Sequence, residues 1–351
     1  MFNDRRVYGS ARLRSVCFMA ARRRCQFSKP KATQAWFRNV IMLHFEDIGL
    51  ISNLRLRAMK TFPGIVLAIV LALAWHTNAG AADGPVKLVA AENFYGDIAH
   101  QIGGARVEVI SVMSNPDQDP HLFEISPTVS RQLAAAQIVI YNGADYDPWM
   151  PKLLTTTTKP GRVVIVAADL VHKKAGENPH LWYDPPTMPA VAKTLTAELV
   201  KTDPAHAAEY RERLSTFLAS LKPIDEKIEA IRQKYAGAAV TASEPVFGYM
   251  ASALGLKMRN ERFQLSIMNS TEPSVHDLAA FEQDLKDHRV RLLFFNRQAS
   301  DKIVQHLIDL AHVSKVPVVA VTETMPSGLT FQQWMLNEID DTEKALAAPP
   351  S

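Results

Sequence analysis

The sequence predicts an α/β fold of two α/β lobes with parallel sheets, joined by one long connecting helix. Two observations support this prediction. Short, nearly continuous apolar runs alternate with helical stretches in both halves of the chain, and such runs are typical of parallel strands covered on both faces. Between the halves lies a helical region without strand signals, from about Pro189 to Tyr235.

The first lobe is expected to span residues 82–188. Its apolar runs are short and rich in Val and Ile, which favours strands over helices. A helix is expected after the first run, and another over residues 127–136. The predicted strands are residues 86–92, 107–113, 137–143 and 162–169.

The second lobe, residues 238–351, repeats the pattern with strands at 238–243, 290–297 and 316–322. The connector between the lobes, residues 189–237, contains a helix of about 30 residues, which would be roughly 45 Å long. Asp203-Pro204 suits the start of this helix, and Pro223 is expected to kink it. A helical connector predicts less lobe motion than a flexible Gly/Ser hinge would allow.

The segment before the first lobe is expected to be removed or never made. Residues 59–81 combine a basic start, an apolar run from Phe62 to Trp75 and a small-residue exit, which are the parts of a signal peptide. This run is shorter than the roughly 20 residues that span a bilayer. An uncleaved anchor is the alternative. Because a signal works at the N-terminus, we interpret Met59 as the true start and residues 1–58 as a mis-assigned upstream extension.

Charge and cysteine content separate these segments from the lobes. The whole chain carries +3, but residues 1–58 alone carry +9 and hold both cysteines, and Lys60 adds +1, so residues 82–351 carry −7 and no thiol. An acidic, cysteine-free chain argues against thiol catalysis, thiolate metal ligation and nucleic-acid partners. A basic nucleic-acid-binding arm around Arg22-Arg23-Arg24 is the competing interpretation of the first segment. The common nucleotide, serine-hydrolase and metalloprotease motifs are absent from the sequence.

Four side chains are candidates for a metal site. His121 in QDPHLF and His180 in ENPHLW each follow a proline that stiffens the loop before the imidazole. Glu244 and Glu323 each follow a predicted strand, and open parallel sheets bind ligands beyond the carboxyl ends of their strands. Two imidazoles and two carboxylates suit Zn²⁺ or Mn²⁺. Solvated loop histidines and plain surface acids are the alternative interpretation.

Five stretches give the chain a family resemblance that covers residues 86 to 346. They are AAENFYGDIAHQIGG, DPHLFEISPTVSRQLAAAQIVIYNG, NPHLWYDPPTMPAVA, SEPVFGYMASALGL and VPVVAVTETMPSG. In this order they resemble the zinc- and manganese-binding solute receptors of bacterial ABC importers. The resemblance implies two α/β lobes joined by a long helix, with the metal between the lobes.

The resemblance also implies a ligand set. His121 and His180 match the two family histidines of the first lobe, and Glu244 falls where zinc-type members have His and manganese-type members have Glu. Glu323 stands where members commonly have Asp, so water or a shifted acid such as Glu272 is an alternative fourth ligand. Many zinc receptors of this kind have a His-rich loop, which this chain lacks, since only His172 occurs between His121 and His180. The absence of that loop and the presence of Glu244 favour manganese, whereas the intrinsic affinity order of divalent metals favours zinc.

The expected function is therefore that of a periplasmic receptor, not an enzyme. It would capture Zn²⁺ or Mn²⁺ as a monomer, without nucleic acid, and deliver the ion to the membrane permease of an ABC importer. A receptor for a metal chelate or other small solute is the alternative, and a metallohydrolase with the same side chains is a third interpretation. Around the site, Asp119 and Asn178 are candidates to orient the imidazoles, and the aromatic side chains that could exclude water are Phe123, Trp182, Phe247 and Tyr249.

Overall fold

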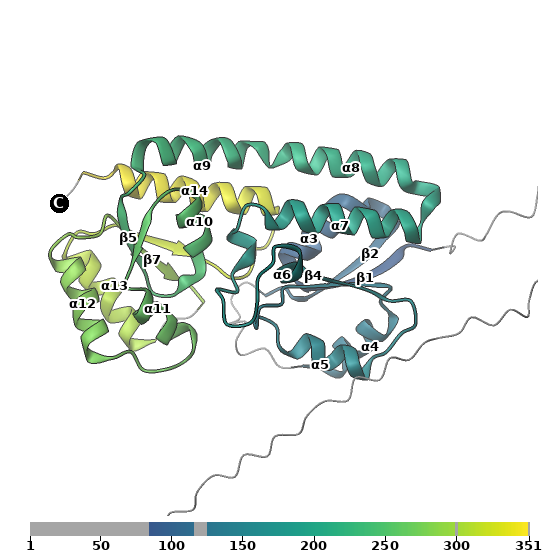
Figure 1. The fold of residues 1–351 in the computed structure, drawn as a ribbon, viewed down its shortest axis with the longest axis horizontal. Helices are drawn as coiled ribbons and strands as arrows, with labels where there is room; N and C mark the ends of the chain where they lie inside the picture. Colours follow the sequence, from purple (N-terminus) through teal and green to yellow (C-terminus); the bar gives the residue numbers. More distant parts are fainter. Residues whose placement is uncertain (1–83, 116–124, 299–300, 350–351) are drawn as a thin grey trace, which may run out of the picture. The chain divides into compact units, whose positions relative to one another are not determined.

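The computed structural model describes residues 84–115, 125–298 and 301–349. Within them the chain forms two sheets of four parallel strands, which belong to one unit spanning residues 78–351 (Figure 1). The strand orders, β2-β1-β3-β4 and β6-β5-β7-β8, follow the same topology, which confirms the predicted fold class. The strands are β1 (Val86–Glu92), β2 (Val107–Met113), β3 (Ile138–Tyr141), β4 (Val163–Val166), β5 (Ala239–Ala242), β6 (Lys257–Arg259), β7 (Leu293–Asn296) and β8 (Val318–Val321).

The first lobe begins with a strand that runs directly into a helix. Close packing of that helix, α3, on β2 requires two glycines. A Cβ at Gly96 would lie 2.0 Å from the Oγ of Ser111, and one at Gly103 would lie 2.2 Å from a methyl carbon of Val107. The helices of this lobe are α3 (Asn93–Gly103), α4 (Pro127–Ala135), α5 (Trp149–Thr156), α6 (Ala167–Leu170) and α7 (Thr187–Thr202).

The second lobe contains one strand that the sequence pattern does not predict. β6 is three residues long and two of its side chains are exposed, so it lacks the apolar run that reveals the other strands. Three helices of the second lobe, α12, α13 and α14, start at side-chain caps. Ser274 and Asp301 accept hydrogen bonds from backbone N–H groups of the first turn, and Thr330 forms a capping box with Gln333. The helices of this lobe are α10 (Gly248–Ala253), α11 (Glu261–Met268), α12 (Val275–Lys286), α13 (Lys302–Val313) and α14 (Phe331–Ala347).

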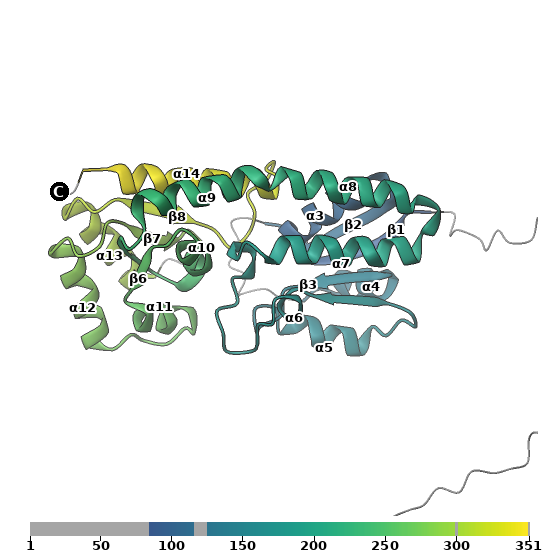
Figure 2. The same cartoon turned by 45° about the horizontal axis from the view of Figure 1, so that its top comes forward.

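The connector is helical, as predicted, and it breaks where the proline requires. It consists of α8 (Ala207–Ser220) and α9 (Lys222–Tyr235), which meet at Leu221. Pro223 lies in the first turn of α9, where its missing N–H is tolerated, and its ring prevents α8 from continuing. Helix α8 packs on α3 and α7, while α9 packs beside α14 (Figure 2).

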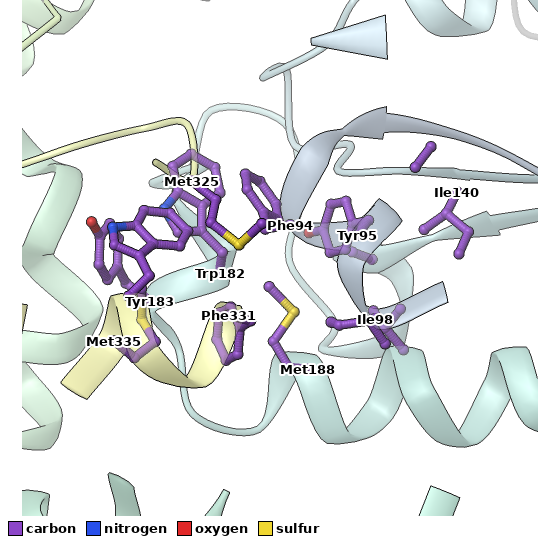
Figure 3. Close-up of a cluster of buried hydrophobic side chains, with 14 of the residues drawn as sticks. Phe94, Tyr95, Ile98, Ile140, Trp182, Tyr183, Met188, Met325, Phe331 and Met335 are labelled. Atoms are coloured by element: carbon purple, nitrogen blue, oxygen red, sulfur yellow. The ribbon is translucent and has the colours of Figure 1, made fainter. Parts of the chain in front are cut away.

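The hydrophobic core continues from one lobe into the other. One cluster of buried side chains includes residues of both sheets, and a smaller cluster around Phe263 and Phe281 lies in the second lobe. Since the shared core is large and apolar, separating the lobes would expose much of it, so we expect restricted lobe motion. Figure 3 shows its centre, formed by Phe94, Tyr95 and Ile98 of α3, Ile140, Trp182, Tyr183, Met188, Met325, Phe331 and Met335.

Hydrogen bonds join the lobes beside this core. Asn93 of α3 makes two of them with the backbone of Met325, with Nδ2 donating at 2.7 Å and Oδ1 accepting at 3.1 Å. One turn further, the carboxylate of Asp97 accepts a hydrogen bond from the backbone N–H of Phe331. The segment between β8 and α14 is therefore held to the first lobe at Met325 and again at Phe331, where α14 begins.

Two parts of the expected organisation lie outside the described residues. These are the extension 1–58 and the signal peptide 59–81. In the described part of the chain, we find no helix with the length and apolar character needed to cross a membrane. The lobe boundaries at 188 and 237 remain predictions.

Candidate metal centre

His180 is buried at the end of a proline-stiffened loop. Its side chain is 1% exposed, and the short helix Leu181–Tyr183 begins directly after it. The carbonyl of Pro179 accepts a hydrogen bond at 2.8 Å from Nδ2 of Asn142, which follows β3. The loop is thus anchored to the end of a central strand, and the imidazole has little freedom.

Asn178 fixes which ring nitrogen of His180 carries the proton. Its Nδ2 donates to the carbonyl of Pro245 at 2.8 Å, so its Oδ1 faces Nδ1 of His180, at 2.6 Å. An amide oxygen can only accept, so Nδ1 carries a hydrogen, and in the neutral imidazole the lone pair is therefore on Nε2. Among the described residues Nε2 has no hydrogen-bond partner, and it lies 3.5 Å from Oε2 of Glu323. This is the tautomer that a metal ligand needs.

Removing the Asn178 side chain is expected to weaken metal binding by about tenfold, within the range for residues that orient a ligand. Asn178→Ala frees the imidazole to rotate and to change tautomer, and it also breaks the link to Pro245. Isothermal titration with Zn²⁺ and Mn²⁺ measures the change. Asn269→Ala, at an exposed asparagine, is the matched control. Equal affinities for the two variants would contradict the orienting role.

The two predicted glutamates face a common amide. Glu244, 4% exposed, follows β5, and Glu323, 1% exposed, follows β8. Nδ2 of Asn296, the last residue of β7, donates at 2.6 Å to Oε2 of Glu244 and at 2.6 Å to Oε1 of Glu323. Because β5, β7 and β8 are neighbouring parallel strands, their carboxyl ends bring these three side chains together.

The orientation of Asn296 is itself fixed by its surroundings. Its backbone N–H donates to Oγ of Ser243, and its Oδ1 accepts from the backbone N–H of Gln298. Oε1 of Gln298 in turn accepts from the backbone N–H of Glu323 at 2.6 Å. The amide hydrogens of Asn296 therefore point at both carboxyl groups, and they would reduce the repulsion between these groups when both are ionised.

The structure thus brings together three of the four predicted site residues. His180 lies next to Glu323, and Glu323 shares the amide of Asn296 with Glu244. His121 lies outside the described residues, as do Asp119 and Phe123. Among the described residues, no three His, Cys, Asp or Glu side chains are grouped closely enough to hold a metal ion. The four-residue ligand set remains a proposal.

Tyr146 is a site residue that the sequence analysis missed. Its ring stands edge-on to the imidazole of His180, with ring centroids 6.1 Å apart. Burial raises the pKa of Tyr146 well above its usual value, and the nearby carboxylate of Glu323 raises it further, so the hydroxyl is neutral. Tyr146 follows three residues with left-handed backbone, Gly143, Ala144 and Asp145, and such a turn has no clear sequence signature at its non-glycine positions.

A buried acid pair supports this turn. Asp147 accepts hydrogen bonds from the backbone N–H groups of Asn142 and Gly143, at 2.6 and 2.9 Å. Burial raises the pKa of Asp147 to about 6. Burial and the charge of Asp147 raise the pKa of Glu92, at the end of β1, well above its ordinary value. Glu92 therefore holds its proton more tightly than an exposed glutamate does, while Asp147 is largely ionised at neutral pH.

The other candidate residues divide clearly by burial. Trp182 and Phe247 are buried, and the indole of Trp182 packs edge-on against His180 with ring centroids 5.3 Å apart. Tyr249 donates a hydrogen bond from its hydroxyl to the backbone carbonyl of Asn178. Glu272, the alternative fourth ligand, is exposed, whereas Glu323 is buried. The remaining histidines in the described ranges are exposed or half-buried, namely His100, His172, His206, His276, His288, His306 and His312.

The buried side chains of His180, Glu244 and Glu323 are an imidazole and two carboxyl groups, which are group types that bind divalent metals. A model of the zinc-uptake complex component A family, a family of periplasmic proteins, matches residues 88–345. The chain belongs to this family. It is a metal-binding receptor of an uptake system, as the sequence analysis predicts.

Curated relatives of this receptor are about a quarter identical to it over the aligned residues. A putative metal-binding protein of Treponema pallidum is 23% identical over 284 residues, covering 74% of the receptor chain and 87% of its own. The manganese-binding lipoprotein MntA of Bacillus subtilis is 24% identical over 263 residues, covering 70% and 84%.

Solved structures with the same fold include the periplasmic zinc-binding protein TroA of Treponema pallidum. It aligns with a TM-score of 0.65 at 20% identity, covering 75% of the receptor chain and all of its own. The manganese-bound periplasmic metal-binding protein of Candidatus Liberibacter asiaticus aligns with a TM-score of 0.60 at 17% identity, covering 74% and 98%. At this identity the likeness concerns the fold alone.

Proposed function

We propose that this receptor captures Zn²⁺ or Mn²⁺ with His121, His180, Glu244 and Glu323 and delivers it to the membrane permease of an ABC importer. The observation that carries the proposal is the convergence of buried donors. Nε2 of His180 faces the carboxyl group of Glu323 in the other lobe. The amide of Asn296 donates hydrogen bonds both to Glu323 and to Glu244. Two imidazoles and two carboxylates would form an N₂O₂ set for a bare divalent ion.

The burial of the donors favours a bare ion over an organic ligand. Side chains that are 1–4% exposed leave little room for a chelate or other small solute to approach them. No bond needs to be made or broken in this function, so the protein acts as a receptor and not as an enzyme. It would work as a monomer with a permease as partner, without nucleic acid.

Metal binding should depend on pH because protons compete for every proposed donor. An imidazole must be neutral and a carboxylate ionised to bind the cation, so acidification releases it. This dependence does not require a change in fold.

Adding metal to the purified, metal-free receptor is expected to raise its melting temperature. An ion that binds only the folded state stabilises it by about 2.7 kcal/mol at a free concentration of 100 times Kd. Thermal unfolding with Zn²⁺, Mn²⁺, Mg²⁺ and Ca²⁺, together with elemental analysis of protein purified without added metal, tests the proposal. An unchanged melting temperature with Zn²⁺ and Mn²⁺ would exclude the proposed function.

We also propose that the receptor is periplasmic and is exported by the signal peptide 59–81. The relatives named as lipoproteins support an extracytoplasmic location. We expect the mature protein, isolated from the producing cell, to start near Ala82. N-terminal sequencing of the periplasmic fraction measures this. A mature chain that starts upstream of Met59 would contradict both the signal peptide and the interpretation of residues 1–58.

A further inference from the structure

Glu338 is a buried acid on α14 that contacts segments from both lobes. Its side chain is 8% exposed. Oε1 accepts hydrogen bonds from Nε1 of Trp334 at 2.8 Å and from the backbone N–H of Thr322 at 3.2 Å. Oε2 lies 2.5 Å from the hydroxyl oxygen of Tyr183. Every oxygen of this carboxyl group is therefore engaged, and none of its partners carries a positive charge.

Counting hydrogens gives the protonation state of Glu338. The hydroxyl of Tyr183 also lies 2.8 Å from the carbonyl oxygen of Thr322, so it has two acceptor groups as neighbours but only one hydrogen. If Tyr183 donates to the carbonyl, the short contact with Oε2 needs a hydrogen on Glu338. Burial also raises the pKa of Glu338, to about 8, which agrees with this count.

The partners of Glu338 lead directly to the proposed ligands. Tyr183 is three residues after His180, and the short helix Leu181–Tyr183 connects them rigidly. Thr322 immediately precedes Glu323. The ring of Tyr183 also packs edge-on against Phe247, with ring centroids 5.0 Å apart, and Phe247 belongs to the short helix that follows Glu244. Three segments that carry proposed ligands thus meet around the side chain of Tyr183.

We propose that Glu338, as a neutral carboxylic acid, is a positioning residue that holds the His180 and Glu323 segments in register for metal capture. Its protonated oxygen donates to Tyr183, and its other oxygen accepts from Thr322, so one side chain links one lobe to the other. An ionised Glu338 has no hydrogen to donate. Tyr183 would then have to donate its single hydrogen to Glu338 and would lose its hydrogen bond to the carbonyl of Thr322. The inference rests on the proposed function of the site.

Two substitutions separate the neutral acid from a mere space filler. Glu338→Gln retains a donor and an acceptor in the same places, and we expect its affinity for Zn²⁺ and Mn²⁺ to stay within about threefold of the wild type. Glu338→Leu fills similar space without polar atoms and should weaken binding about tenfold or more, as does loss of other ligand-supporting residues. Isothermal titration measures both. Leu346→Ala, which shortens a buried side chain further along α14, is the control for helix destabilisation alone.

Tyr183→Phe provides a second, independent variant if Glu338→Leu fails to fold. It keeps the ring packed on Phe247 but removes the hydroxyl, and it should also weaken binding about tenfold. Wild-type affinity after Glu338→Leu or Tyr183→Phe, or an equal loss in Glu338→Gln and Glu338→Leu, would overturn the positioning role. Parallel titration of His180→Ala distinguishes this failure from failure of the site. A wild-type receptor that binds neither metal overturns both proposals.

Discussion

Replacing His180 with alanine is expected to lower the affinity for Zn²⁺ and Mn²⁺ by at least about 100-fold, or roughly 2.7 kcal/mol. The imidazole is 1% exposed, its Nδ1 is committed to Asn178 and its Nε2 lone pair faces Glu323. Alanine removes the imidazole nitrogen that would bind the metal and puts no polar atom in its place. Isothermal titration at neutral pH, with metal-free protein, measures the loss.

The control for this experiment is a histidine of the same chain that lies away from the site. His276, on α12, is exposed, so His276→Ala should bind both metals as the wild type does. Circular dichroism establishes that both variants are folded. If His180→Ala retained wild-type affinity and stoichiometry, the assignment of His180 as a ligand would be wrong, even if the protein still bound metal elsewhere.

The second large effect concerns stability at alkaline pH. We expect the free energy of unfolding of Glu338→Gln, relative to that of the wild type, to be higher at alkaline pH than at pH 5. Burial raises the pKa of Glu338 from 4.5 to about 8 in the folded protein. Below about pH 4.5 both the folded and unfolded chains are protonated. Between 4.5 and 8 only the folded chain keeps the proton, so stability falls as pH rises, and above 8 it stays at the lower level.

Glutamine cannot titrate and therefore lacks this slope. From pH 4.5 to about 8, the difference in free energy of unfolding between Glu338→Gln and the wild type should change by about 3–5 kcal/mol in favour of Glu338→Gln. A constant offset from the extra amide hydrogen of glutamine cancels, because only the change with pH is compared. Other buried acids such as Asp147 titrate in both proteins alike. Urea unfolding between pH 5 and 9 measures the effect, and parallel stability curves would show that Glu338 is ionised at neutral pH.

The fold was predictable because its strong signals are local. The apolar runs at 86–92 and 107–113 became β1 and β2 at the predicted residues, since buried parallel strands need nearly continuous apolar sequence. The break between α8 and α9 follows from Pro223 alone. β6 escaped prediction because its exposed positions carry charged side chains, and its place in the sheet depends on pairing with β5.

The site was predictable only in part, because its supporting contacts come from distant segments. Asn178 was foreseen as an orienting residue because it is next to the Pro-His step. Asn296 lies 52 residues from Glu244 and 27 from Glu323, and nothing in its own neighbourhood indicates that its amide bridges them. Tyr146 was hidden for a similar reason, since the left-handed turn before it is held by Asp147 and not by a recognisable turn sequence.

By itself, the sequence determined the two α/β lobes, the helical connector, the acidic and cysteine-free character of residues 82–351 and the family resemblance. These properties depend on periodicity, composition and short motifs, which are fixed by residues near one another in the chain. Only the tertiary structure decided that His180 faces Glu323, that Asn296 joins two carboxylates and that Glu338 is buried against Tyr183 and Thr322. Those properties arise from burial and from hydrogen bonds between groups that meet only after the lobes have packed together.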